Sequence, residues 1–233
     1  MSESFNKSNA KIESKLNNFE KYVRRQALAR FIARYELFKL QMDISGSIVE
    51  CGVHEGGGLF AWAKLSANLE PIAIQRKIIG FDTFSGFPSI NKKDTRGKIE
   101  KPKLMKGEFE ENYNIFNELK ECIKEYDNNR FLNQYNKIEL VKGDATVTIP
   151  KFIKDNPHII ISLLFLDFDL YEPTKAAIDY LVPRMPKGGV LVFDEINNES
   201  WPGETVAMLE KFKISNYKIS RFNFDPNISY IVL

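Results

Sequence analysis

The chain has 233 residues, which is enough for one domain with a full hydrophobic core, and its composition is ordinary for a globular protein. Its formal net charge of +2 is near balance and gives no argument for nucleic acid or an acidic membrane surface as a partner. The 2 cysteines are too few for a disulfide framework, and no apolar run approaches the length of a membrane span. We therefore expect a cytoplasmic protein with free thiols and with no nucleic-acid or membrane partner.

The segment before the first predicted strand divides into two parts. Residues 1–10 are polar, and we expect them to form a disordered tail. Over residues 11–45, apolar side chains recur at helical spacing between lysines and arginines, which predicts one or two amphipathic helices. Such helices would pack on a sheet, contribute to a substrate pocket or form the interface of a homodimer, and the sequence does not choose between these roles.

Apolar runs alternate with amphipathic segments along the rest of the chain. This alternation predicts an α/β fold in a single domain, with a doubly wound, mostly parallel sheet and right-handed crossovers. The last two runs are close in sequence, which indicates an antiparallel pair at the sheet edge. Residues 83–135 form an insertion far longer than a normal connection, so we expect a lid there, and its second half, residues 109–131, is polar with helical spacing. The seven predicted strands cover residues 47–51, 77–82, 138–141, 159–166, 190–193, 217–222 and 229–233, and helices are predicted at 59–69, 148–155, 174–181 and 202–212.

A glycine-rich loop follows the first predicted strand, with the sequence Glu-Cys-Gly-Val-His-Glu-Gly-Gly-Gly at residues 50–58. Glycines allow a ligand to approach the backbone closely, and the N-terminus of the next helix favours an anionic group. The spacing is not the G-x-G-x-x-G of dinucleotide-binding proteins, and the Gly-Lys-Ser/Thr ending of a phosphate-binding loop is missing. A tight structural turn would require similar residues.

Acidic residues stand at the ends of four further predicted strands. Asp82 and Asp144 end the second and third strands, and Asp82 would accept hydrogen bonds from ribose hydroxyls. Asp167 ends the fourth strand, and Asp194 and Glu195 end the fifth. Acids at such ends face the crevice where open α/β sheets bind ligands, and three carboxylates together there make an all-oxygen site suited to Mg²⁺. Each acid taken alone would equally cap a helix or a turn.

Longer motifs show which family the chain resembles. Gly-Phe-Asp-Thr-Phe-Ser-Gly-Phe-Pro from Gly80 and Asp-Phe-Asp-Leu-Tyr-Glu-Pro-Thr-Lys from Asp167 are specific in combination. With the glycine loop, Lys-Gly-Asp at 142–144 and Trp-Pro-Gly at 201–203, they resemble the macrocin O-methyltransferase (TylF/MycF) family of metal-dependent sugar O-methyltransferases, over about residues 48–212. The resemblance implies a Rossmann-like, class I methyltransferase fold, S-adenosylmethionine and Mg²⁺ as cofactors, and a small sugar-containing acceptor.

The resemblance also implies roles for particular residues. Asp167, Asp194 and Glu195 would be the Mg²⁺ ligands, although the family usually has two aspartates and a tyrosine where this chain has Asp-Glu-Ile. Glutamate keeps the charge but reaches one methylene further. Asp144 would lie near the adenine amino group. The full set implied in cofactor binding is Glu50, Gly52, Val53, Gly56, Asp82, Thr83, Asp144 and Ala145.

Methyl transfer to a sugar hydroxyl requires a better oxygen nucleophile than the neutral hydroxyl. Coordination to Mg²⁺ would lower the pKa of that hydroxyl and orient it toward the methyl group. Asp167 would then take the proton, and His54 on the glycine loop is the alternative base. Tyr171 and Trp201 lie just beyond the two metal-ligand strands and would stack on a sugar face.

Two other functions stay open at this point. A catechol-like phenol also chelates Mg²⁺ through its vicinal hydroxyls, so the acceptor of a small-molecule O-methyltransferase could be of that kind. A non-catalytic nucleotide- or sugar-binding protein of methyltransferase ancestry belongs to a different class, and the three intact carboxylates argue against it. Nucleic-acid methylation is disfavoured because the chain has neither an Asn/Asp-Pro-Pro-aromatic tetrad nor a basic patch.

Overall fold

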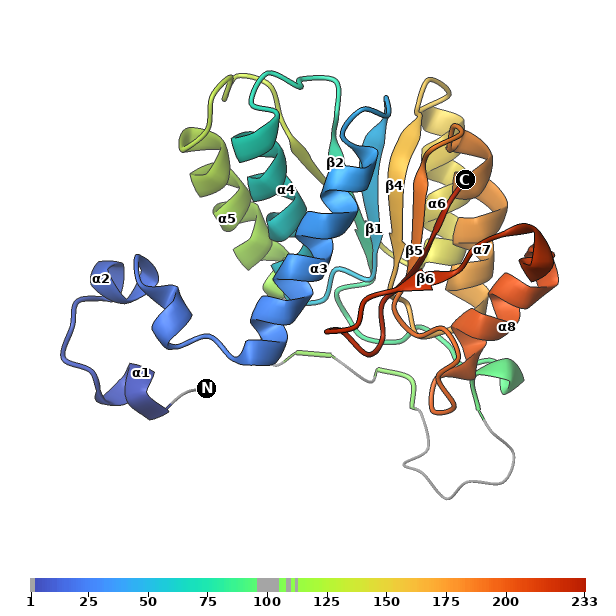
Figure 1. Cartoon of the computed structure of the whole chain (residues 1–233), viewed down its shortest axis with the longest axis horizontal. Coiled ribbons are helices and arrows are strands. Elements are labelled where there is room, and N and C mark those ends of the chain that lie inside the picture. Colours follow the sequence, from blue (N-terminus) through green and yellow to red (C-terminus); the bar gives the residue numbers. More distant parts are fainter. Residues whose placement is uncertain (1–2, 96–104, 108–109, 112) are drawn as a thin grey trace.

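The computed structural model describes residues 3–95, 105–107, 110–111 and 113–233. In this part of the chain one sheet of 7 strands has the order β3-β2-β1-β4-β5-β7-β6. The first five strands pair in parallel, and the last two add an antiparallel pair at the edge, as predicted (Figure 1). The strands are β1 (Ser47–Cys51), β2 (Ile78–Asp82), β3 (Ile138–Lys142), β4 (Ile161–Leu166), β5 (Val190–Phe193), β6 (Ser220–Arg221) and β7 (Ser229–Val232).

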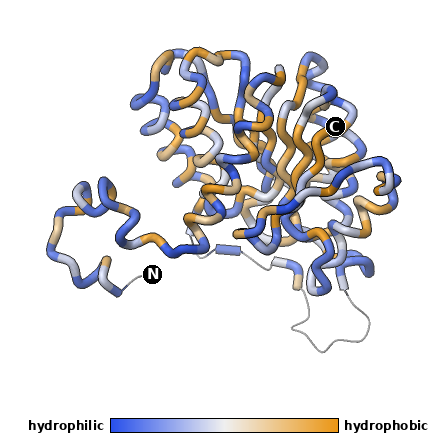
Figure 2. Tube along the Cα trace, in the orientation of Figure 1, coloured by the Kyte–Doolittle hydropathy of each residue, from blue (hydrophilic) through white to orange (hydrophobic). Residues whose placement is uncertain are grey.

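Helices cover both faces of the sheet, which confirms the doubly wound α/β fold. One core cluster lies under α3, α4 and α5, and the other lies under α6, α7 and α8 (Figure 1). Figure 2 shows apolar residues concentrated along the central strands. No helix in the described ranges is both long and apolar enough to cross a membrane. The helices on the sheet are α3 (Arg25–Gln41), α4 (Gly57–Leu69), α5 (Ile115–Asn128), α6 (Ala145–Asp155), α7 (Tyr171–Leu181) and α8 (Pro202–Lys211), and the 3₁₀ turns are Phe19–Lys21, Lys92–Asp94, Val182–Arg184 and Ile214–Asn216.

The central strand β4 is buried at every position. Helices cover both sides of a parallel sheet, so its strands carry continuous apolar runs rather than an alternating pattern. Leu163, Leu164 and Phe165 are completely buried, and each such side chain contributes about 1.5–3 kcal/mol to stability. The residue that follows β4, Asp167, is therefore held on a rigid base.

The order of the strands in the sheet changes direction between β1 and β4. β2 and β3 lie on one side of β1, and β4 and β5 lie on the other, so the loops after β1 and β4 diverge and leave a crevice between them. The strand ends are level, because Cys51 pairs with Leu166 and Leu166 pairs with Phe193. This register brings the glycine loop, Asp167 and Asp194 to one edge of the sheet.

The N-terminal segment differs from the expectation of a disordered tail. Its described part contains the short helix α1 (Glu3–Lys7), which is followed by α2 (Ile12–Leu16). The ammonium of Lys15 donates to the carbonyl of Phe5 at 2.7 Å and lies 4.7 Å from the centre of the Phe5 ring. These two short helices lie apart from the sheet, whereas α3 packs on it (Figure 1).

The long connection after β2 was expected to supply a lid over residues 83–135, with helical spacing in its second half. Its second half forms α5, which belongs to the helix layer because Leu119 and Tyr126 are buried in the core. The hydroxyl of Tyr126 donates to the carbonyl of Ala63 in α4 at 2.8 Å. The amphipathic pattern of α5 therefore reflects packing beside α4. The predicted lid also includes residues 96–104, 108–109 and 112, which lie outside the described residues.

Candidate active site

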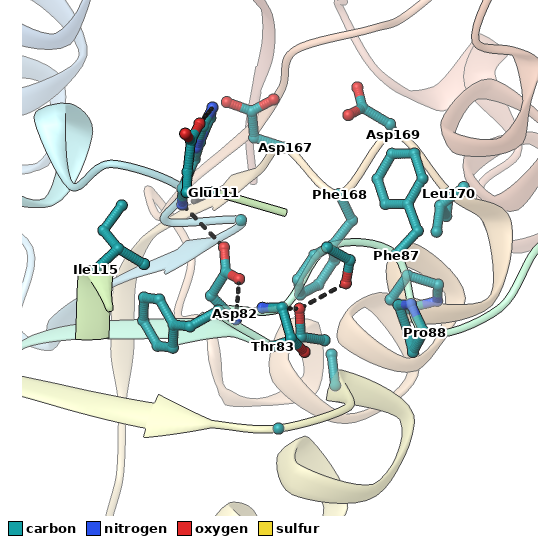
Figure 3. Close-up of a pocket in the computed structure, with 18 residues that line it drawn as sticks. Asp82, Thr83, Phe87, Pro88, Glu111, Ile115, Asp167, Phe168, Asp169 and Leu170 are labelled. Atoms are coloured by element: carbon teal, nitrogen blue, oxygen red, sulfur yellow. Dashed lines mark hydrogen bonds and ion pairs between the residues drawn. The ribbon is translucent and has the colours of Figure 1, made fainter. Parts of the chain in front are cut away.

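A cavity opens at the carboxyl ends of β1, β2, β3 and β4 (Figure 3). It contains about 900 Å³ of empty space when the open mouth is included. All four strand-end loops contribute to its wall, so it lies at the crevice that the strand order creates. The lining residues are Gly52, His54, residues 82–88, Glu111, Ile115, Gly143, Ala145, residues 167–170 and Pro173.

The glycine loop lies directly against the loop that follows β4. Gly52 has φ +91°, and a Cβ atom placed there would lie 1.9 Å from the carbonyl oxygen of Asp167. Gly56 has φ +84° at the N-terminus of α4, and its added Cβ would meet Leu119 of α5 at 2.4 Å. Only glycine satisfies both the positive φ and the close approach, so these two residues are required by the shape of the loop.

Asp82 holds the glycine loop in place. Its Oδ2 accepts hydrogen bonds from the backbone amides of Val53 and His54, both at 2.8 Å, and its Oδ1 accepts from the amide of Phe84 at 2.7 Å. An ionised carboxylate has about four acceptor positions, so a position is left for a ribose hydroxyl. Figure 3 shows Asp82 and Thr83 on the cavity wall. That Asp82 would hold this loop was not predicted from the sequence. The contact arises because β1 and β2 are neighbours in the sheet.

We expect Asp82→Ala to lower the free energy of unfolding by about 2–4 kcal/mol, because three backbone amides lose a charged acceptor. Asp82→Asn keeps one acceptor oxygen, so the decrease in its free energy of unfolding should be about half as large. Urea denaturation of the two variants and the wild type would measure the difference. Equal unfolding free energies for Asp82→Ala and the wild type would contradict the bracing role.

Glu50 lies beneath the glycine loop and does not line the cavity. It alternates with Val49 and Cys51 on β1, so its side chain faces α3 and α4. Its Oε1 is 3.7 Å from Nη2 of Arg34, and a Cβ on Gly58 would fall 1.8 Å from the same oxygen. Burial raises the pKa of Glu50 to about 7, an effect that Arg34 opposes. Glu50 thus ties α3 to the base of the loop.

The third strand end contributes backbone rather than a free carboxylate. Asp144 caps α6, where its Oδ1 accepts hydrogen bonds from the amide of Thr146 at 2.9 Å and from its hydroxyl at 2.7 Å. Its neighbours Gly143 and Ala145 line the cavity. The hydroxyl of Thr83, in the loop after the neighbouring strand β2, donates to the carbonyl of Gly86 at 2.7 Å.

The acids after β4 and β5 form a buried, electrostatically coupled group. Asp167 lines the cavity, and burial together with the charges of Asp194 and Asp169 raises its pKa well above the usual range. Burial and the charge of Asp194 also raise the pKa of Glu195. The pKa of Asp167 and that of Glu195 are thus both raised by burial and by the charge of the same neighbour, Asp194.

Two further charged residues of this group were missed from the sequence. Arg30 of α3 makes a two-point ion pair with Asp194, and Glu204 of α8 is fully buried. Oε1 of Glu204 accepts from the amide of Glu195 at 3.1 Å, and its Oε2 has no hydrogen-bond partner among the described residues. Sequence periodicity gave no signal for either residue, because both look like ordinary polar positions of an amphipathic helix.

The chemistry of the strand-end acids suits a hard divalent cation. They offer carboxylate oxygens and are largely buried, and the neighbouring Glu204, whose Oε1 accepts from the amide of Glu195, has a second oxygen without a hydrogen-bond partner among the described residues. Within the described ranges no three carboxylate, imidazole or thiolate groups are already arranged around one point for a metal. Asp194 instead binds Arg30 with both of its oxygens.

His54 lines the cavity, and its side chain is 49% exposed. Its φ of +48° is unusual for a residue other than glycine, and its Nε2 lies 3.9 Å from Oε1 of Glu111. Both side chains border the cavity mouth, so His54 is within reach of a ligand there.

The structure places the two predicted aromatic contacts outside the cavity wall. Tyr171 is buried, and its hydroxyl donates to Oε2 of Glu210 at 2.6 Å. Its amide opens α7 by donating to Asp94 at 2.6 Å. Trp201 packs edge-to-face on Phe87, with ring centres 6.1 Å apart, and Phe87 is part of the wall. Trp201 therefore supports the cavity from behind.

The sheet order, the glycine loop and the strand-end cavity together define a class I methyltransferase fold. The family model described as Macrocin-O-methyltransferase (TylF) matches residues 24–219. The chain belongs to this family, as its motifs indicated, and it is accordingly an O-methyltransferase. No sequence among the curated proteins matches the chain.

Solved structures agree with this assignment. The calicheamicin methyltransferase CalS11 is 32% identical with a TM-score of 0.93, over 98% of this chain and 88% of that one. The apo structure of CalS11, described as a TDP-rhamnose 3'-O-methyltransferase of calicheamicin biosynthesis, is 29% identical with a TM-score of 0.83, over 98% of this chain and 89% of that one. An O-methyltransferase from Bacillus cereus, solved with S-adenosylhomocysteine, is 12% identical with a TM-score of 0.53, over 99% of this chain and 95% of that one, and shows the fold alone.

Proposed function

We propose that the protein transfers a methyl group from S-adenosylmethionine to a sugar hydroxyl of a nucleotide-linked deoxysugar or a glycosylated metabolite. The observation that carries the proposal is that Asp167 lines the same cavity as Gly52, Gly143 and Ala145. An acidic side chain and the backbone of two loops that we expect to bind the cofactor thus line one cavity. The similarity to CalS11, which is described as acting on TDP-rhamnose, supports a sugar acceptor.

The cofactor would be held mainly by backbone. The α4 N-terminus, with Gly56 as its cap, favours the carboxylate end of S-adenosylmethionine. Gly52 and Val53 would contact its methionine portion, Asp82 and Thr83 its ribose, and the loop around Asp144 and Ala145 its adenine. When bound, the cofactor supplies an activated methyl group on its sulfonium.

Mg²⁺ would be held by Asp167, Asp194 and Glu195, which fit it in donor chemistry. When bound, the cation lowers the pKa of an acceptor hydroxyl. Asp167 would accept the proton of that hydroxyl, and His54, which also lines the cavity, is the alternative acceptor. Phe84 and Phe87 of the wall would exclude water from the reacting atoms.

The function is tested by methyl transfer from labelled S-adenosylmethionine to a panel of nucleotide sugars, with catechols as the competing acceptor class. We expect the methyl label to appear in a nucleotide sugar. EDTA should lower the rate of labelling at least tenfold, because chelation removes the activating cation, and excess Mg²⁺ should restore that rate. Activity unchanged by EDTA would disprove the metal requirement. Label found only in catechols would show that the acceptor is a phenol and not a sugar. Calorimetry that detects no binding of S-adenosylmethionine would refute the proposed methyl transfer.

A further inference from the structure

Arg30 is the cation that helix α3 brings to the strand-end acids. Its Nη2 donates to Oδ2 of Asp194 at 2.7 Å, and its Nη1 donates to Oδ1 of the same carboxylate. The side chain of Asp194 is only 4% exposed, whereas that of Arg30 is 28% exposed. The carboxylate is therefore buried, and its guanidinium partner reaches it from a more exposed position.

The ion pair uses both oxygens of Asp194. A guanidinium that binds a carboxylate with two parallel hydrogen bonds uses both of its oxygens, which are also the atoms that would bind a metal ion. Two cations against one carboxylate would also repel each other strongly in this buried setting. Arg30 and a divalent cation would therefore compete for the same carboxylate oxygens of Asp194.

A second carboxylate lies within reach of Arg30. Nη1 of Arg30 is 3.9 Å from Oδ1 of Asp225. Asp225 is held in place because the same oxygen accepts the amides of Asn227 and Ile228, both at 3.0 Å. An arginine released from Asp194 would thus find a fixed anionic partner by a change of side-chain rotamer, without a movement of α3.

We propose that Arg30 and the divalent cation are alternative partners of Asp194, so that Arg30 holds the metal-binding carboxylate in place until the cation displaces the guanidinium toward Asp225. This inference rests on the proposed function and adds a residue that sets the affinity of the site for its cation. Arg30 is a positioning residue in this arrangement, since it acts through Asp194.

Binding of Mn²⁺ to the full-length protein, followed by the electron paramagnetic resonance signal of the free ion, tests the proposal without any turnover. We expect Arg30→Gln to bind Mn²⁺ about tenfold more tightly than the wild type, because the binding-competent form of Asp194 is no longer a minor population. Arg30→Lys keeps the charge but not the two-point contact, so its affinity should lie between the two. The matched control is Arg25→Gln, which removes the same charge from an exposed position of α3 and should bind like the wild type.

The melting temperature gives an independent readout. Without a cation, Arg30→Gln leaves Asp194 buried and uncompensated, so its melting temperature should fall, and Mn²⁺ should raise it by more than it raises that of the wild type. If Arg30→Gln does not fold, Arg30→Lys carries the same comparison. Unchanged or weaker Mn²⁺ binding in both variants would overturn the proposal while leaving the wild-type metal site intact. Absence of Mn²⁺ binding in the wild type would overturn it together with the metal requirement, whereas S-adenosylmethionine binding would still support the methyltransferase.

Discussion

Replacing Asp167 with asparagine is expected to lower kcat by about 10²- to 10⁴-fold, the usual contribution of a positioned proton acceptor. Asparagine is nearly isosteric, so the contact between this loop and Gly52 is kept while the negative charge is lost. The affinity for S-adenosylhomocysteine, measured by calorimetry, should stay within a few-fold of the wild-type value. Steady-state kinetics with the acceptor identified from the panel would give kcat.

The neighbouring acid provides the control for this variant. Asp169 also lines the cavity, but no metal or proton-transfer role is proposed for it, so Asp169→Asn should lower kcat much less than Asp167→Asn does. A joint loss of turnover and cofactor affinity in Asp167→Asn would show that Asp167 serves the cofactor instead. Loss of turnover in His54→Gln with near-normal activity in Asp167→Asn would assign the base to His54.

Gly52→Ala is expected to abolish cofactor binding and to lower the free energy of unfolding by about 3 kcal/mol or more. The added methyl would lie 1.9 Å from the carbonyl oxygen of Asp167, which is backbone and can move only if β1 and β4 separate. The φ of +91° adds strain for any residue other than glycine. Urea denaturation and titration with S-adenosylhomocysteine would measure the two losses.

Gly57, five residues further along the same loop, is the matched control. A Cβ on Gly57 meets no described atom within 4 Å, and the residue is the first of α4. Gly57→Ala should therefore change the unfolding free energy by less than about 1 kcal/mol, in the stabilising direction, because alanine favours the helix. Wild-type cofactor affinity in Gly52→Ala would contradict the account of the loop.

Two of the roles predicted from the sequence, those of Glu50 and Tyr171, differ from the positions that strand and helix geometry give these side chains. Glu50 was assigned to the cofactor by motif, whereas in the structure it shares with Ile48 the face of β1 toward α3 and α4. Tyr171 was assigned to a sugar, but α7 begins at this residue and not at Thr174, since Pro173 fits the first helical turn. The ring of Tyr171 consequently turns into the contact between α7 and α8.

The sequence by itself determined the order of strands and helices, the antiparallel edge pair, the family and the acids at each strand end, because hydrophobic periodicity and short motifs are local properties. Only the tertiary structure decided how the acids are used. Asp82 braces a loop 29 residues before it, and Arg30 pairs with Asp194 164 residues after it. Contacts across such separations depend on the strand order and on how α3 lies across the sheet, and no local pattern encodes these arrangements.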